Sequence, residues 1–320
     1  GRWSRFKFGV STFWRRWCDW FDWMMPEAWN IEHNTRHHYN LSEIHDPDLV
    51  EQNMQALRDQ GGPVIFKYIN VFVLMCTWKW FYYAPNTYKE LKLAKMRRAG
   101  DAIPKGVNPE EPITFKDIFT KHNVFYSGWE FLGTVLGPYL LIHFFLTPLP
   151  FYFAGEMLGD YGYTGAMMYK NSVANLFIAE VFTNIHSFIA IATNHAGDDM
   201  YRFKHACRPY SGSFFLRQIL ASVDFDMGTD SIDFMHGWLN YQIEHHLWPN
   251  LSMRSYQQSA PTVRAICEKY GVPYVKHNVL WRLKMTIDIM VGNTSMRTFP
   301  ESVENEWLRR DAEMEAEKNK

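Results

Sequence analysis

The feature that most constrains this chain is the run QIEHH at residues 242–246, which gathers several nitrogen and oxygen donors in a short stretch. On an α-helix, Gln242, His245 and His246 fall inside an arc of about 100°. Such an arc can face one metal ion, and neutral imidazole suits iron, copper, nickel or zinc. The run therefore predicts a metal site, provided that the rest of the chain supplies further ligands.

A second histidine group lies far upstream, in the run EHNTRHHYN, which carries His33, His37 and His38. On an α-helix His33 and His37 share a face one turn apart, whereas His38 is rotated by about 100° from His37. One helix is thus expected to offer ligands to two metal ions. A lone histidine is usually a hydrogen-bonded core residue, but a dense group echoed by a second one favours metal binding.

Composition favours a membrane protein and argues against a nucleic-acid partner. Aromatic residues make up 17% of the 320 residues, as in the belts at membrane interfaces; an aromatic-rich soluble core is the alternative. The mean hydropathy of -0.31 indicates that much of the chain lies outside any bilayer. The net charge of -1 provides no basic field for nucleic acid. The four cysteines are dispersed, so we expect free thiols.

Two apolar segments, residues 131–154 and 174–193, are long enough to cross a membrane and carry few or no charges. The connection between them is poor in Lys and Arg, so by the positive-inside rule it faces away from the side with basic loops. A buried hairpin in a soluble protein is the alternative. We expect a mainly α, integral membrane protein, with a transmembrane helical hairpin and a large histidine-rich helical cap on one face.

Residues 64–83 are also apolar, but they contain Lys67, Asn70 and Lys79, which are costly at a bilayer centre. If the two histidine groups form one site, the chain between them crosses the membrane an even number of times. Counting this segment as a span would make the number odd. We therefore predict an interfacial or partly inserted helix at residues 64–83, followed by a polar, basic loop over residues 86–124.

His195 follows the second predicted span directly, in the run NHAGDD, on the side where both histidine groups are expected. It is therefore a further candidate ligand. Downstream, Asp224, Asp226, Asp230 and Asp233 are expected either to orient ligand imidazoles or to form acidic surface turns.

Three other segments complete the predicted organisation. Residues 1–30, where basic residues alternate with Trp and Phe, predict a helix at a membrane surface or an aromatic helix packed on the cap. Pro261 is placed to begin a helix and Gly271 to end it. Residues 1–300 are expected to form one domain. Residues 301–320 form a densely charged tail, either a solvated helix or a docking element for a partner.

In the runs HNTRHH and YQIEHHLWPNLS the sequence resembles the membrane fatty acid desaturase family, of the front-end type whose last histidine box opens with Gln. The resemblance continues through SAPTVRAICEKYGVPY, and the spacing of boxes, hairpin and NH dipeptide fits residues 30–280. It implies a four-span fold with a histidine-held di-iron centre at the cytosolic face. Such a centre uses O2 and two electrons to remove two hydrogens from an unactivated acyl chain.

Carried over to this sequence, the resemblance implies that the iron ligands and catalytic residues are His33, His37, His38, His195, His245 and His246. Gln242 stands at a ligand position and is expected to coordinate directly or through water. The implied partners are a membrane lipid or other acyl chain and an external electron donor such as cytochrome b5 or ferredoxin. The implied location is the endoplasmic reticulum or an organelle membrane, mitochondrial or plastid.

Two departures from the family pattern leave alternatives open. Family members carry a first histidine box upstream of the second, and no such motif occurs between Gly1 and His33; it either precedes Gly1 or has been lost. The chain also lacks the HPGG haem motif of a fused cytochrome b5 domain. Its start at Gly1 is expected of a processed precursor or a fragment. An acyl desaturase is the leading expectation. The alternatives are a di-iron lipid hydroxylase and a desaturase-like structural subunit of a larger membrane complex, for example a respiratory one.

Overall fold

The computed structural model describes residues 25–114, 116–120, 123–227 and 229–318. The chain divides into two compact units, one from Gly1–Thr35 with Val73–His186, the other from Arg36–Phe72 with Ser187–Lys320. Most of the predicted membrane-surface segment at residues 1–30 lies outside the described residues. The single domain over residues 1–300 stays a prediction. Cys76, Cys207 and Cys267 are free thiols, as predicted.

Among the described residues, three helical stretches are long and apolar enough to cross a membrane, namely Val64–Ala99, Gly128–Met157 and Gly165–Asn194. The last two contain the predicted spans at residues 131–154 and 174–193. A mainly α protein with membrane-capable helices is therefore confirmed. The first stretch contains residues 64–83. Length and composition alone do not distinguish an interfacial helix from a span, so its interfacial position stays a prediction.

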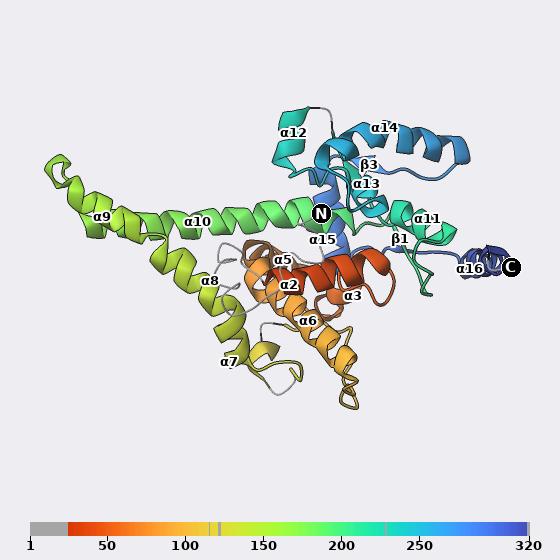
Figure 1. Cartoon of the computed structure of the whole chain (residues 1–320), viewed down its shortest axis with the longest axis horizontal. Helices are drawn as coiled ribbons and strands as arrows, with labels where there is room; N and C mark the ends of the chain where they lie inside the picture. Colours follow the sequence, from red (N-terminus) through yellow and green to blue (C-terminus); the bar gives the residue numbers. More distant parts are fainter. Residues whose placement is uncertain (1–24, 115, 121–122, 228, 319–320) are drawn as a thin grey trace. The chain divides into compact units, whose positions relative to one another are not determined.

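The first unit is built from helices. They are α2 (Pro26–Trp29), most of η1 (Asn30–Arg36), the end of α5 (Val64–Trp78), η3 (Lys79–Tyr83), α6 (Ala84–Ala99), η4 (Asp117–Phe119), α7 (Gly128–Phe131), η5 (Leu132–Leu136), α8 (Gly137–Leu141), η6 (Ile142–Leu146), α9 (Leu149–Met157), η7 (Gly159–Tyr161) and most of α10 (Gly165–Ile191). Figure 1 shows α7, α8 and α9 following one another, with α10 beginning after a turn. The segments η1, η3, η5 and η6 are π-helical.

The predicted loop over residues 86–124 is wrong in its first part, because residues 86–99 continue α6. Pro85 lies in the first turn of α6, directly after the π-helical η3, so the continuous helical stretch changes its hydrogen-bond pattern beside the residue that has no backbone N–H to donate. The helix ends at Gly100, whose φ of 76° is the left-handed conformation that glycine adopts at low cost. The lysines and arginines of this segment therefore project from a helix.

A buried ion pair joins the helices of the first unit. Lys79 Nζ donates to Glu180 Oε2 at 2.8 Å, and His143 Nε2 lies 3.5 Å from the other oxygen of Glu180. One turn further along α10, the Asn184 side chain accepts from the Lys79 backbone N–H at 3.0 Å. Charged groups on apolar helices are costly unless they are paired in this way. His143 thus has a structural partner within the first unit.

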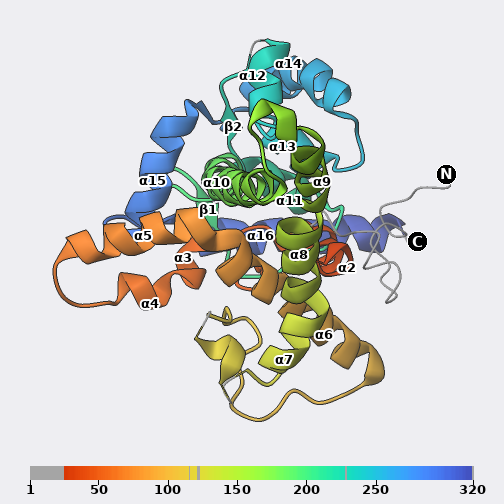
Figure 2. The same ribbon diagram turned by 90° about the vertical axis from the view of Figure 1, so that its left-hand side faces the viewer.

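The second unit combines helices with very short strands. Its elements are the end of η1, η2 (His37–Tyr39), α3 (Val50–Asn53), α4 (Gln55–Arg58), the start of α5, the end of α10, η8 (Ala192–Asn194), β1 (Tyr201–Arg202), α11 (Gly212–Leu220), β2 (Asp224–Phe225), α12 (Asp230–Met235), α13 (Gln242–Leu247), α14 (Met253–Tyr270), β3 (Lys276–His277), α15 (Val279–Val291), β4 (Arg297–Thr298) and α16 (Glu301–Lys318). The strands pair in parallel, β1 with β4 and β2 with β3. Figures 1 and 2 both show α12, α13 and α14 grouped together.

Helix α14 packs on α13 through an apolar cluster of Ile243, Leu247, Val263 and Cys267. It begins one residue after Ser252, whose side chain accepts from the Ser255 N–H, and it ends at Gly271 as predicted. The predicted start at Pro261 is wrong, because this proline lies inside the helix. The buried face runs past Pro261 on both sides, from Tyr256 and Ala260 to Val263 and Cys267, so packing outweighs the single backbone hydrogen bond that proline cannot make.

Residues 301–318 of the charged tail form α16, in whose otherwise exposed first turn Glu304 is buried. Glu304 has no exposed surface; it accepts from Arg217 Nη2 at 3.0 Å and from the His205 backbone N–H at 3.0 Å. Arg217 Nη1 also donates to Glu43 at 2.7 Å. One buried guanidinium therefore ties α16, α11 and the segment after the second histidine box together.

Candidate metal centre

Three buried histidines converge within the second unit, as their sequence pattern led us to expect. The ligand nitrogens of His37, His195 and His246 lie within 4.8 Å of one another. Their ring centroids are 4.7 to 5.0 Å apart, and each pair of ring planes meets at 78° or 79°. Three nearly perpendicular imidazoles at this spacing can each offer one nitrogen to a single ion.

Asn194 explains how the end of the last apolar helix comes to lie beside α13. Its side-chain Nδ2 donates to the carbonyls of Ala190 and Leu239 and to Gln242 Oε1, each at 3.1 Å. The first bond closes the end of the helix, and the other two attach that end to the loop and the first residue of α13. His195, which follows Asn194, is thereby carried to His246.

Hydrogen bonds on the far side of the rings orient two of these histidines. The Nδ1–H of His37 donates to Asp46 Oδ1 at 2.8 Å, and the Nδ1–H of His246 donates to Gln218 Oε1 at 3.1 Å. Both assignments leave the Nε2 lone pair for a ligand. Carboxylate and carbonyl partners behind ligand imidazoles are typical of metal sites, where they fix the tautomer and the ring orientation.

The donor set fits a metal ion. Nε2 of His246 is buried and has no hydrogen-bond partner within the described part of the chain. Buried nitrogen atoms normally have a partner, and a coordinated cation would supply one. Nε2 of His195 accepts from the Gln242 side chain at 2.9 Å, which places that amide beside the same three rings.

The electrostatics keep most of these imidazoles neutral, the form that binds metals. Burial, together with the neighbouring histidines, holds the pKa of His195 and of His246 well below the ordinary value. Burial also lowers the pKa of His245 to about 4. His37 differs, because the charge and hydrogen bond of Asp46 outweigh burial and raise its pKa. A metal ion at His37 would therefore compete with a proton.

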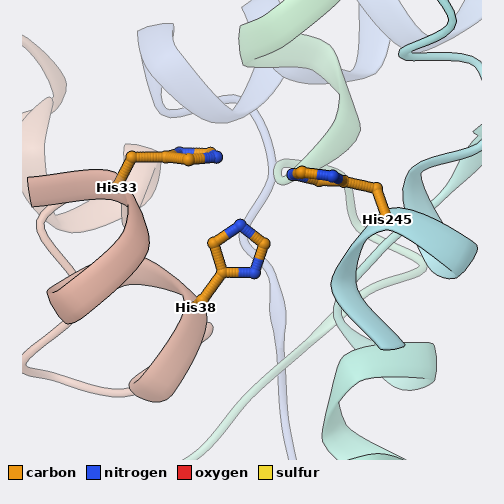
Figure 3. A group of neighbouring side chains, drawn as sticks. All are labelled: His33, His38 and His245. Carbon is orange, nitrogen blue, oxygen red and sulfur yellow. The ribbon is translucent and has the colours of Figure 1, made fainter. Parts of the chain in front are cut away.

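A second pair of histidines adjoins the first group. The rings of His38 and His245 are 4.8 Å apart at an angle of 72°, and the His38 ring lies 4.5 Å from that of His246. Figure 3 shows His38 on η2 and His245 on α13 turned toward each other. His33, also labelled there, is carried by η1; it belongs to the first unit, where its ring stacks on Trp29 at 4.9 Å.

The α-helical phase expected for the second box is wrong. The box runs from the π-helical η1, which ends at Arg36, directly into the 3-10 helix η2, which begins at His37. Hydrogen bonds in a π-helix join residues five apart, and those in a 3-10 helix join residues three apart. The rotation of about 100° per residue that relates His33, His37 and His38 on an α-helix therefore does not apply.

Of the four predicted carboxylates, two are buried beside the third histidine box, the run QIEHH, and accept hydrogen bonds from its backbone or from the two residues before it. Asp224 is buried and accepts from the Ile243 backbone N–H at 2.9 Å and from the Tyr274 hydroxyl. Asp233 is also buried and accepts from Asn240 and from the Tyr241 hydroxyl. The remaining two, Asp226 and Asp230, are exposed, as surface turns would be.

Two residues behind the rings were missed by sequence reasoning. Asp46 stands in the run HDPD, which looks like a simple turn before a helix, so nothing in the sequence around it indicates a contact with His37. Gln218 lies in the middle of α11 and has no motif around it. Its role depends on how α11 packs, which local sequence does not reveal.

Known proteins resemble the chain in the same region. The sequence profile of the fatty acid desaturase family matches residues 4–278. The chain is 30% identical over 122 residues to the NADPH-dependent stearoyl-CoA 9-desaturase of Mycobacterium tuberculosis, which covers 36% of the chain and 28% of that protein. It is 33% identical over 132 residues to fatty acid desaturase 3 of Bos taurus, with coverage of 41% and 25%.

A longer match has lower identity. The chain is 24% identical over 267 residues to the Delta 8-(E)-sphingolipid desaturase of Candida albicans, which covers 80% of the chain and 40% of that protein. The chain thus spans less than half the length of each of these relatives. No solved structure matches it. Because the family profile covers most of a chain that carries membrane-capable helices, this protein belongs to the membrane fatty acid desaturase family.

Proposed function

We propose that the protein is a membrane di-iron fatty acyl desaturase, an oxidoreductase that introduces a double bond into an acyl chain with O2 and two electrons. The observation that carries the proposal is the buried group of His37, His195 and His246, whose ligand nitrogens lie within 4.8 Å of one another. Family membership supports the same conclusion.

The ligand assignment follows from the two histidine groups. In this proposal His37, His195 and His246 hold one iron, and His38 and His245 contribute to the second. His33 and Gln242 serve as further ligands, His33 because it opens the second box and Gln242 because its amide reaches the His195 ring. When bound, the iron pair would supply the O2 chemistry that removes hydrogen from an unactivated carbon.

The chain's own residues prepare this chemistry by orientation and burial. Asp46 keeps the proton of His37 on Nδ1, and Gln218 does the same for His246, so the Nε2 lone pairs of both rings would be available to a metal ion. The three imidazoles are almost fully excluded from water, which protects a reactive centre from side reactions. Apolar helices such as α5 and α10 expose Phe66, Phe72 and Phe182, as contact with lipid requires.

The proposed partners are an acyl-chain substrate and an external electron donor such as cytochrome b5 or ferredoxin. The names of the relatives cite a stearoyl-CoA substrate, a sphingolipid and a dependence on NADPH. These names support a lipid acyl chain and an outside source of electrons. The proposed location is the membrane of the endoplasmic reticulum or of an organelle.

The direct test is to express the complete gene, with an electron donor, in a host that lacks polyunsaturated lipids and to profile its fatty acids. A new double bond is expected, and replacing His246 by Ala should abolish it. The matched control is His236→Ala, because His236 donates to the Ile232 carbonyl of its own helix rather than to the histidine group. A product heavier by one oxygen atom would indicate a hydroxylase. An unchanged profile would contradict desaturase activity and favour a structural subunit.

A further inference from the structure

Arg282 on α15 is fully buried, and its guanidinium faces the segment that carries His195. Nη1 donates to both carboxylate oxygens of Asp199, at 2.7 and 2.8 Å. Nη2 donates to the Ala196 carbonyl at 2.8 Å. A buried arginine is costly unless its donors are satisfied, so these contacts hold the segment tightly.

The contacts of α15 bracket His195 on both sides. Upstream, Arg282 Nε donates to the Thr193 carbonyl at 3.4 Å. Downstream, the Thr286 hydroxyl adds a second donor to the Ala196 carbonyl, at 3.1 Å. Beyond η8 the chain around His195 is an irregular turn, so no helix or strand fixes its backbone there. The position of the imidazole therefore depends on these side-chain contacts and on Asn194.

Gly197 shows how closely Arg282 approaches this turn. A Cβ atom at Gly197 would lie 2.5 Å from Arg282 Nη2 and 2.6 Å from Asp199 Oδ1. Both distances are far below van der Waals contact, so any side chain at this position would push the guanidinium away from Asp199. Glycine is thus required here because the Arg282 guanidinium and the Asp199 carboxylate lie so close to the backbone, and not because of an unusual backbone angle.

We propose that Arg282, through Asp199 and the Ala196 carbonyl, is the positioning residue for His195 and hence for the metal ion shared with His37 and His246. The inference rests on the proposed function, because it presumes that these histidines bind a metal. It assigns to α15 a role in the metal centre, although α15 contributes no ligand. Arg282 touches neither metal nor substrate in this role and acts only through the turn.

The test is a Co²⁺ titration of the complete protein in detergent, followed by the visible absorption bands of the bound ion, with His195→Ala as the reference for a lost ligand. Arg282→Met and Gly197→Ala are expected to weaken Co²⁺ binding about 10- to 100-fold, the usual effect of losing an outer-shell partner, and to alter the absorption bands. Arg282→Lys should recover part of the affinity. The controls are Lys284→Met, which changes an exposed i,i+4 pair on α15, and Gly61→Ala, where a Cβ meets nothing within 4 Å.

Thermal melts of the same variants separate positioning from stability. Variants that melt earlier but bind Co²⁺ with wild-type affinity and absorption would overturn the inference, because Arg282 would then be purely structural. If Arg282→Met does not fold, Gly197→Ala and Arg282→Lys carry the same test. A wild-type protein that binds no Co²⁺ would overturn the proposed function and this inference together. Wild-type binding that Gly197→Ala leaves unchanged would overturn this inference alone.

Discussion

Replacing Arg217 by Met is expected to destabilise the second unit by about 3–5 kcal/mol, the usual cost of removing one partner from a buried ion pair. Arg217 is almost fully buried and bridges two carboxylates, Glu43 at 2.7 Å and Glu304 at 3.0 Å, which are equally buried. Without the guanidinium both carboxylates stay in the interior with no cation.

Two features place the expected loss near 3 kcal/mol, the lower end of that range. Each carboxylate keeps a backbone donor, Cys207 N–H for Glu43 at 3.2 Å and His205 N–H for Glu304 at 3.0 Å. Burial already raises the pKa of Glu43, although the charge of Arg217 lowers it. Removing the arginine therefore raises this pKa further, and the protonated Glu43 escapes part of the penalty for a buried charge.

The assay is chemical denaturation of the detergent-solubilised protein followed by tryptophan fluorescence. The matched control is Arg309→Met on α16, because Arg309 and Glu313 form an exposed i,i+4 pair worth about 0.3–0.5 kcal/mol. A loss below about 1 kcal/mol for Arg217→Met, similar to the control, would refute the reasoning that the bridge is desolvated.

Two further variants test the structure elsewhere. Asp46→Asn is expected to weaken Co²⁺ binding about 10- to 100-fold, because His37 loses the charged acceptor that holds its ring at 2.8 Å; unchanged binding in the titration would contradict this. Lys79→Met is expected to lower the melting temperature more than Lys92→Met, because it removes the buried ammonium partner of Glu180, whereas Lys92 lies in a partly exposed ion pair. Equal shifts would argue against a buried pair.

The histidine groups were visible in the sequence because ligand spacing on a short segment depends only on nearby residues. The run QIEHH lies within α13, and the NH dipeptide stands at the end of the last apolar helix. That the two groups form one site was the premise from which an even number of membrane crossings was predicted, and the structure brings His37 to His246. Their role as ligands stays a prediction.

Residues that support the histidines from a distance were not visible in the sequence. Gln218 is 28 residues from His246, and Arg282 is 83 residues from Asp199. Neither belongs to a motif, and each acquires its partner only when separate helices pack. A charged or amide side chain on a helix is usually solvated, so composition alone predicts the opposite of what Arg282 does.

The type and the bounds of individual helices could not be predicted from the sequence either. Nothing in the residues before His37 signals a π-helix, since π-helical turns arise where packing tolerates an extra residue in a turn. Pro261 gave a misleading signal for a similar reason, because the apolar face of α14 continues past it. Sequence spacing therefore predicted which histidines come together, whereas the packing of the helices determined in which direction each side chain points.

The most direct test of the account is the iron content of the complete protein, purified in detergent and measured by elemental analysis. We predict about two iron atoms per chain, lost when His37, His195 and His246 are replaced together by Ala, while a folded melting transition remains. A wild-type protein without iron, or iron retained in full by the triple variant, would contradict the claim that these buried histidines form a metal centre.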